Sequence, residues 1–173
     1  ILGDGSVQKS SARREDRMGH CVLYEVIGLG KLGLVQRNNL QMQSTYYPTD
    51  SDLYVEGVSG AAMLVRKEVY ASVGGFDPEF LHGGEDTYFC KRCLELGYRI
   101  KFVAGAQLNH YDNRSGAKAS VKTFVKSLDS RYTFFRKVEG SFSAFVYRLG
   151  VLAFYCFRLL IVAVASTLKR KPD

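Results

Sequence analysis

The sequence predicts an α/β fold, and three observations support this class. Strand-like and helix-like segments alternate from residue 53 to residue 138, which is typical of a sheet with helices packed on it. Apolar residues make up 46% of the 173 residues, which is enough for one globular core. A long apolar segment at the C-terminus predicts one further helix. Because no complete first β-α-β unit precedes these elements, the sheet is expected to be partial.

Residues 1–19 and 36–52 are polar and predict turns and loops, and residues 6–8 could form a short edge strand, whereas residues 20–35 are more apolar with helical spacing. Residues 10–17 carry mixed charge and are expected to form an exposed loop. A Gly-x-Gly-x-x-Gly spacing at residues 28–33 matches a dinucleotide-binding fingerprint. It follows helix-like apolar spacing rather than a strand, so we interpret it as a coincidence. The chain begins without an initiator Met and is therefore expected to be part of a longer protein.

The middle of the chain predicts two strands and a short helix. Residues 53–60 have the composition of a strand that ends in a glycine. Residues 61–65 are a small-to-large apolar run, which predicts a second, buried strand. Residues 66–73 predict a short helix, which Gly74 and Gly75 would end.

Four further elements are predicted between residues 85 and 138. A helix with an apolar stripe is expected from Glu85 to Leu96, ended by Gly97. Residues 98–103 alternate as a strand, and residues 106–110 predict another short strand. Residues 119–138 have the periodicity of an amphipathic helix.

Glu85 and Asp86 are the most informative residues of the chain. They begin a predicted helix directly after two glycines, which have no side chains to block a ligand. A carboxylate in that place can act as a general base toward a hydroxyl. Acidic residues there can equally serve only to oppose the helix dipole. His110 ends a predicted strand, where ligands of open α/β sheets gather; it could hold a metal beside Asp86 or be an ordinary strand-end histidine.

The cysteines and the overall charge restrict the function further. Cys90 and Cys93 form a C-x-x-C pair inside a predicted helix, and no second pair completes a zinc site. Redox pairs lie at helix N-termini, so a structural role and a reducing compartment are expected. The net charge of +7 indicates an anionic partner or a generally basic surface. The basic residues form no dense track with interleaved aromatics, so nucleic acid is not an expected partner.

Several short motifs surround the acidic pair in a fixed order. They are Val58-Ser59-Gly60-Ala61-Ala62-Met63-Leu64-Val65-Arg66, Val73-Gly74-Gly75-Phe76-Asp77, Gly84-Glu85-Asp86, Arg92, Gly97-Tyr98-Arg99-Ile100 and His110. Together they resemble family 2 glycosyltransferases, and most closely the rhamnosyltransferase-type branch that builds bacterial cell-surface polysaccharides. The resemblance covers roughly residues 3–160. It implies a GT-A fold and an inverting transfer from a nucleotide-sugar donor to a saccharide or lipid-linked acceptor.

The resemblance also implies roles for single residues. Asp86 matches the general base that deprotonates the acceptor hydroxyl, and Glu85 would orient the acceptor or support the base. His110 matches a histidine that completes the divalent-metal site in some members.

Three other motif positions would contact substrates. The segment Ser59-Gly60-Ala61 matches backbone that passes close to the donor sugar and the acceptor. Arg92 matches an arginine of the helix after the base, where a structural salt bridge is as plausible as a ligand contact. Arg114, in the loop after His110, could meet the donor phosphate.

The resemblance is to the C-terminal, acceptor-side half of the family's domain. The family's Asp-x-Asp metal motif belongs to the other half, and Asp50-Ser51-Asp52 has that spelling but comes too late in the order. We therefore expect a divalent metal, Mg or Mn, whose ligands mostly lie outside this chain. The chain alone is expected to be inactive.

The apolar segment at residues 142–168 predicts a helix that contacts a membrane. Its length is enough to span a bilayer, but Arg158 lies in its middle and is costly there. On a helical wheel Arg148, Arg158, Ser166 and Lys169 share one side, which favours a helix lying in the membrane interface. A true span and a helix packed on the domain or on a partner are the alternatives.

These expectations combine into one interpretation. Residues 1–140 would be the C-terminal half of a glycosyltransferase domain, and residues 141–173 a membrane-associating helix with a basic tail. The enzyme would work in polysaccharide synthesis at the cytoplasmic face of the cell membrane. The alternative is a non-catalytic, membrane-associated binding subunit that retains part of the fold.

Overall fold

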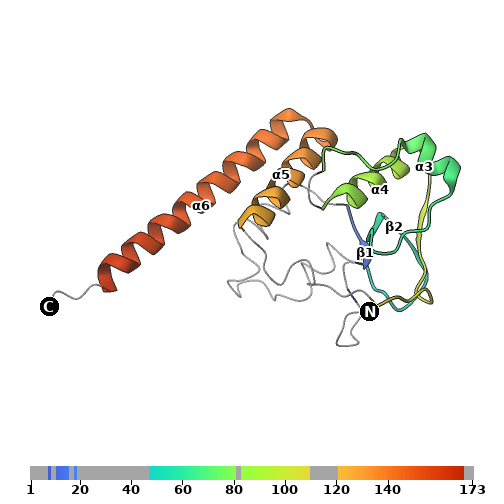
Figure 1. The fold of residues 1–173 in the computed structure, drawn as a ribbon, viewed down its shortest axis with the longest axis horizontal. Coiled ribbons are helices and arrows are strands. Elements are labelled where there is room, and N and C mark those ends of the chain that lie inside the picture. The colour runs from blue at the N-terminus through green and yellow to red at the C-terminus, as the bar shows by residue number, and fades with distance from the viewer. Residues whose placement is uncertain are drawn as a thin grey trace.

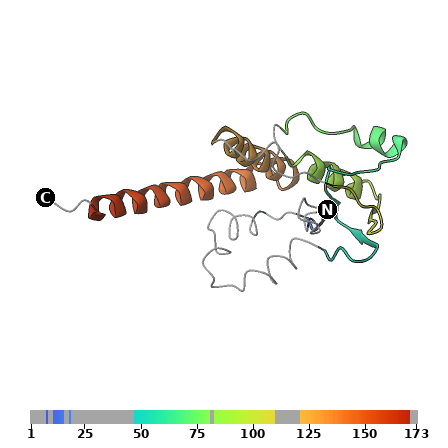
Figure 2. The same cartoon turned by 60° about the horizontal axis from the view of Figure 1, so that its bottom comes forward.

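The structure is a computed structural model. It describes residues 8, 11–15, 18, 47–80, 83–109 and 121–169. Short strands and the helices α3 and α4 form a compact body, and the long helices α5 and α6 form a hairpin beside it (Figure 1). The α6 helix continues well beyond its partner and away from the body in both ribbon views (Figure 2).

The strands form two separate antiparallel pairs. β1 (Ala12–Arg13) pairs with β3 (Gly57–Val58), and β2 (Leu53–Val55) pairs with β4 (Ile100–Phe102). The single strand predicted at residues 53–60 is therefore divided, and each half has its own partner. Glu56 stands at the division, where its carboxylate accepts the Glu15 amide at 2.5 Å. The mixed helix and strand content agrees with the predicted α/β class, but the described strands form no parallel sheet.

The prediction of a buried strand at residues 61–65 is wrong. The Ala62 amide donates to the Ser59 carbonyl at 3.4 Å, which turns the chain, and Leu64 is fully exposed. The second strand predicted after Gly105 is also absent from the described residues, since the Ala106 amide donates to the Val103 carbonyl and forms a turn. Apolar composition alone does not make a strand without a neighbouring strand to pair with.

α3 (Lys67–Val73) confirms the predicted short helix and its stop. Gly74 follows at a φ of 85°, in the left-handed region that glycine adopts without steric cost. α4 (Glu85–Glu95) likewise begins at Glu85 as predicted. It buries Phe89 and Cys93 against Val73 in one apolar cluster.

α5 (Val121–Val138) and α6 (Ser141–Lys169) share a second apolar cluster. Its buried members are Phe134, Phe135, Ala144, Tyr147 and Val151. All come from the last turns of α5 and the first part of α6, so the hairpin is held together at its closed end. Tyr88 of α4 packs against this cluster, which joins the hairpin to the body.

The loop between α3 and α4 is attached to α5 by ion pairs. Lys137 Nζ lies 2.8 Å from Asp77 and 3.2 Å from Glu79, and Arg136 also pairs with Glu79. The hydrogen bond from Lys137 is the main cause that lowers the pKa of Asp77, and partial burial opposes it. These contacts hold the loop that leads into the acidic pair.

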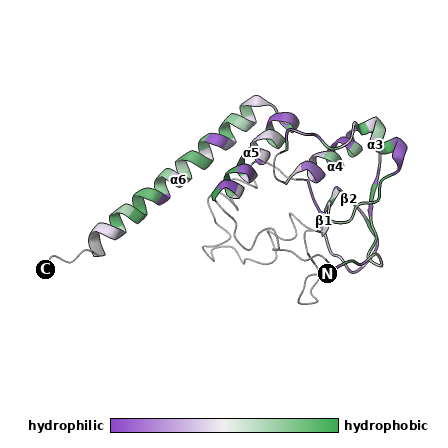
Figure 3. Cartoon of the chain, viewed as in Figure 1, coloured by the Kyte–Doolittle hydropathy of each residue, from purple (hydrophilic) through white to green (hydrophobic). Residues whose placement is uncertain are grey.

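The distal part of α6 is apolar and exposed. Figure 3 shows hydrophobic residues along most of its length. Among the described residues, one segment is long and apolar enough to cross a membrane, Ser141–Thr167, whose most apolar stretch has a mean hydropathy of 2.2. Only 6% of its most apolar stretch is buried, so this stretch of α6 is not part of the core, in contrast to the first part of the helix.

Candidate active site

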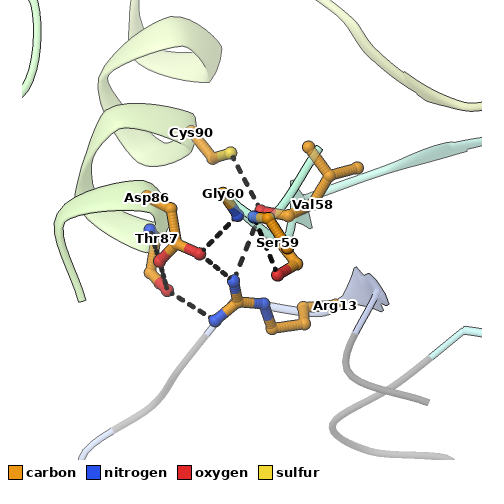
Figure 4. A network of polar contacts seen from close by, with 8 residues as sticks. Arg13, Val58, Ser59, Gly60, Asp86, Thr87 and Cys90 are labelled. Atoms are coloured by element: carbon orange, nitrogen blue, oxygen red, sulfur yellow. Dashed lines mark hydrogen bonds and ion pairs between the residues drawn. The ribbon is translucent and has the colours of Figure 1, made fainter. Parts of the chain in front are cut away.

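The turn after β3 closes directly onto the first turn of α4. The Gly60 amide donates a hydrogen bond of 2.8 Å to Asp86 Oδ2. A Cβ atom at Gly60 would lie only 3.2 Å from the Asp86 Cβ, so the close approach depends on glycine. Two of the predicted motif segments, Ser59-Gly60-Ala61 and Glu85-Asp86, therefore meet in space (Figure 4).

Arg13 approaches the same carboxylate from β1. Its guanidinium pairs with Asp86 Oδ2 and donates to Thr87 Oγ1 at 3.0 Å and to the Val58 carbonyl at 3.3 Å. The antiparallel pairing of β1 with β3 brings Arg13 to this place. The arginine thus ties together three segments that are far apart in the sequence.

The second oxygen of Asp86 is bound by the next residue. Oδ1 accepts the Thr87 amide at 2.7 Å and the Thr87 hydroxyl at 3.3 Å. A carboxylate has about four acceptor positions, and here each oxygen accepts two hydrogen bonds. The Asp86 side chain is 13% exposed. The Thr87 hydroxyl makes the longest of the four bonds, and it can rotate away from the carboxylate.

An apolar hollow of about 760 Å³ borders the same turn. Its wall includes Val58, Ser59, Ala61, Phe89 and Cys93, and Arg66 and Lys101 also line it. A volume of this order suits a drug-sized ligand. Asp86 is not part of the wall, although Ser59 and Ala61 of the neighbouring turn are.

Comparisons with known proteins point to one activity. A model of the family described as the N-terminal domain of galactosyltransferase matches residues 40–114, a segment that contains both sides of the site. Rhamnosyltransferase WbbL of Escherichia coli is 30% identical over 96 residues. Pre-mycofactocin glycosyltransferase of Mycobacterium tuberculosis is 39% identical over 61 residues. The chain is similar to glycosyltransferases.

This finding confirms the resemblance inferred from the motifs. The matched part is 54% of this chain for WbbL and 35% for the mycobacterial glycosyltransferase. In the other direction the match covers 35% of WbbL and 13% of the mycobacterial protein. The chain thus spans about a third or less of these glycosyltransferases. No solved structure matches it.

The other residues predicted for a glycosyltransferase site are distributed unevenly. Glu85 is half-buried at the first position of α4, next to Asp86. Arg92 lies on another face of that helix, with its guanidinium 5.9 Å from the Tyr88 ring centroid and close enough to help lower the pKa of Asp77. The structure therefore places Arg92 in the packing between α4 and the loop before it, and not beside Asp86.

The residues predicted to serve a metal or phosphate give no ligand set in the described part of the chain. His110 and Arg114 lie outside the described residues. Asp52 is paired with Lys101 at 2.9 Å and accepts the Ala104 amide; the interpretation of Asp50-Ser51-Asp52 as a loop coincidence stays a prediction. Among the described residues no three His, Cys, Asp or Glu side chains gather to hold a metal.

Cys90 and Cys93 have the structural role expected of them. Both are buried and free. Burial is the main cause that raises the pKa of the Cys90 thiol to about 11, so the nucleophilic thiolate is not formed at neutral pH. The Cys90 Sγ lies 4.0 Å from the Val58 carbonyl and packs behind the turn at Gly60.

Arg13 is the site residue that the sequence did not reveal. Its segment was expected to be an exposed loop, which is wrong, because Ala12 is completely buried and the Arg13 side chain is only 22% exposed. Nothing in the local spacing distinguishes Arg13 from Arg14. Only the long-range pairing of β1 with β3 selects it.

Proposed function

We propose that this chain is the acceptor-side part of an inverting glycosyltransferase of the GT-A fold. It would move a sugar from a nucleotide-diphosphate donor to a saccharide or lipid-linked acceptor. One observation carries the proposal: the segment that matches the galactosyltransferase family, residues 40–114, contains both the Ser59–Gly60 turn and the Glu85–Asp86 pair. The fold closes these two elements on each other.

In the proposed reaction Asp86 is the general base. The acceptor hydroxyl would replace the Thr87 hydroxyl at Oδ1 and transfer its proton to the carboxylate as its oxygen attacks the anomeric carbon. The bond between that carbon and the nucleotide diphosphate breaks in the same step, so the configuration inverts. Arg13 and the Gly60 amide would keep the carboxylate oriented during this exchange.

The remaining assignments are expectations about parts of the site. Glu85, half-buried beside the base, would orient the acceptor. Ser59 and Ala61 would contact the sugars through their backbone, and Arg114 would meet the donor phosphate. His110 would contribute to a Mg or Mn site. Because the described residues present no ligand set for a metal, no step of the reaction is assigned to it.

The proposed enzyme acts at the cytoplasmic face of the cell membrane, in the synthesis of a cell-surface polysaccharide. The exposed, apolar α6 supports a membrane location, and the similarity to a rhamnosyltransferase supports the transfer of a sugar. The net charge of +7 suits an anionic membrane surface and an anionic donor.

The test is a transfer assay with the longer polypeptide that is expected to contain this chain. UDP-, GDP- and dTDP-sugars would be supplied with a membrane lipid extract and Mg or Mn, and release of the nucleoside diphosphate would be measured. Replacing Asp86 with Asn should lower turnover by about 100-fold to 10,000-fold. Asp129→Asn, at an exposed carboxylate of α5, is the matched control and should leave turnover unchanged. Near-normal turnover of Asp86→Asn would remove Asp86 as the base.

A non-catalytic, membrane-associated binding subunit is the second candidate. The observation that favours it is the complete occupation of the Asp86 carboxylate by donors from its own chain. Such a subunit would bind a saccharide or a nucleotide sugar in calorimetry without releasing nucleoside diphosphate. Turnover that is lost in Asp86→Asn would exclude it.

A further inference from the structure

The stretch of α6 at residues 159–165 has no polar side. Residues 159–165 are apolar without interruption, and all are exposed. Because a helix turns once in about 3.6 residues, their side chains surround the helix completely. A helix that lies on a protein surface, or flat in a membrane interface, keeps one polar face. This stretch is instead suited to immersion in an apolar solvent.

The few hydroxyl groups near the end of α6 are already satisfied by their own helix. Ser166 Oγ donates to the Ala163 carbonyl at 2.7 Å, and Thr167 Oγ1 donates to the Val164 carbonyl at 2.8 Å. Within a bilayer an unsatisfied polar group is costly. These two bonds remove that cost for both hydroxyls.

The first two turns of α5 add a second apolar surface beside Tyr155 of α6. Val121, Phe124 and Val125 are 80%, 43% and 48% exposed. The Phe124 ring lies 5.7 Å from the Tyr155 ring of α6, edge to face. Tyr155 comes just after Val151, the last buried residue of α6. The exposed start of α5 therefore lies beside α6 at the point where α6 leaves the protein core.

The charged residues near the contact between Phe124 and Tyr155 suit a negatively charged surface. Lys122 and Lys126 alternate with the apolar residues at the start of α5, and Arg158 follows Tyr155 on α6. The α6 sequence contains no Asp or Glu, and the first acidic residue of α5 is Asp129. Basic side chains at this position can reach lipid phosphates while their stems remain among apolar groups.

We propose that the first two turns of α5 and the part of α6 beyond Val151 form one membrane-binding surface for an anionic bilayer. α6 enters the hydrocarbon core beyond Tyr155, so that Arg158 remains within reach of the headgroups, and residues 156–167 rise by about 18 Å, more than half of the roughly 30 Å core. Val121, Phe124 and Val125 lie in the headgroup region. This inference deepens the membrane part of the proposed function and is independent of the sugar-transfer part.

The test uses the absence of tryptophan from the sequence, because any introduced Trp is then the sole one. Three full-chain variants are made: Ile161→Trp in distal α6, Phe124→Trp in α5 and Phe142→Trp at the start of α6. Phe142 is 79% exposed but belongs to the closed end of the hairpin, so it is the matched control. Each is mixed with vesicles of phosphatidylcholine and phosphatidylglycerol that carry bromine at defined acyl-chain depths.

The expected result is a gradient of depth. Trp in place of Ile161 shifts to the blue and is quenched most by deep bromines; Trp in place of Phe124 is quenched by shallow bromines only. Trp in place of Phe142 is unchanged by vesicles. With phosphatidylcholine alone, binding of the first two variants is weaker.

Three results would overturn the inference. Equal quenching depth for the first two variants would mean that α6 lies flat in the interface. If vesicles do not change the fluorescence of the Trp at position 124, α5 is not part of the membrane-binding surface. A blue shift at position 161 that rises with protein concentration, without vesicles, would show that a second copy of the chain covers α6. None of these readouts depends on transferase activity.

Discussion

The Gly60 amide and the Asp86 carboxylate are joined by a hydrogen bond of 2.8 Å across 26 residues of sequence. This bond fixes the turn after β3 against the N-terminus of α4. The carboxylate that is proposed as the general base therefore also holds the turn and the helix together.

Gly60→Ala should destabilise the protein. The new Cβ would lie 3.2 Å from the Asp86 Cβ, a stiff backbone-attached neighbour, and overpacking of this kind costs about 1–3 kcal/mol. Gly105→Ala is the control, because a Cβ at Gly105 meets nothing within 4 Å. Thermal unfolding of both variants checks the prediction, which is wrong if the two melt at the same temperature.

Arg13 and Asp86 should prove energetically coupled. Arg13→Ala leaves a largely buried carboxylate without its counter-charge and should cost about 1–3 kcal/mol. In the double variant Arg13→Ala with Asp86→Ala, part of that cost should disappear, because the unpaired charge is gone. Chemical unfolding of the two single variants and the double variant measures the coupling. Simple additivity would mean that the ion pair contributes nothing measurable.

Asp86→Asn should weaken the fold as well as any activity. The Asp86 carboxylate accepts four hydrogen bonds, two at each oxygen. The NH2 group of Asn is itself a donor, so whichever oxygen it replaces, it faces other donors and cannot accept their hydrogen bonds. Leaving such a group unsatisfied costs about 1–3 kcal/mol. The variant should remain folded and unfold at lower denaturant concentration, whereas Asp129→Asn should match the parent protein. Stability equal to that of the parent would contradict the described geometry.

The Asp77–Lys137 ion pair should make stability sensitive to acid. Lys137 holds the pKa of Asp77 below the usual value of 3.8. The stabilisation is therefore complete above about pH 4 and is lost as the pH falls through the lower, folded-state pKa. Lys137→Met should lower the melting temperature at neutral pH by more than in strong acid. The same substitution at the exposed Lys67 should show no such difference, and an acid-independent effect of Lys137→Met would exclude the linkage.

The cysteines should differ sharply in reactivity. Cys156 is exposed, whereas Cys90 and Cys93 are buried and burial raises the pKa of both thiols. In a lipid-free chain carrying Cys21→Ser, a water-soluble disulfide reagent should label one thiol in the native state and three after unfolding. Cys156→Ser should remove the native-state signal, and rapid labelling of Cys90 in the folded chain would contradict its burial.

Local signals predicted the helices well. The glycines at 74, 84 and 97 all adopt positive φ, and such requirements can be recognised from one stretch of sequence. Strand partners could not be predicted in this way. Residues 61–65 have a strand's composition but no pairing strand among the described residues, and Arg13 acquires its place only through β3.

The site residues also divide into those that the sequence could predict and those that depend on long-range contacts. The meeting of Glu85–Asp86 with the Ser59–Gly60 turn follows from motif order, which a resemblance can supply. Arg92 lies on a different face of α4 from Asp86 because of the helical rotation between the two positions, and this could have been predicted from the sequence. The four donors around Asp86 could not, because three of them come from β1, the turn after β3 and a side-chain rotamer of Thr87.

Arg13, Gly60 and Asp86 also constrain how this protein can evolve. They lie in three distant chain segments, and Arg13 and Gly60 each contribute one partner to the Asp86 carboxylate. A substitution in any one of them changes the environment that the other two have adapted to. Divergence at this junction is therefore expected to proceed by compensated, paired replacements, so that related chains keep or exchange these residues as a set.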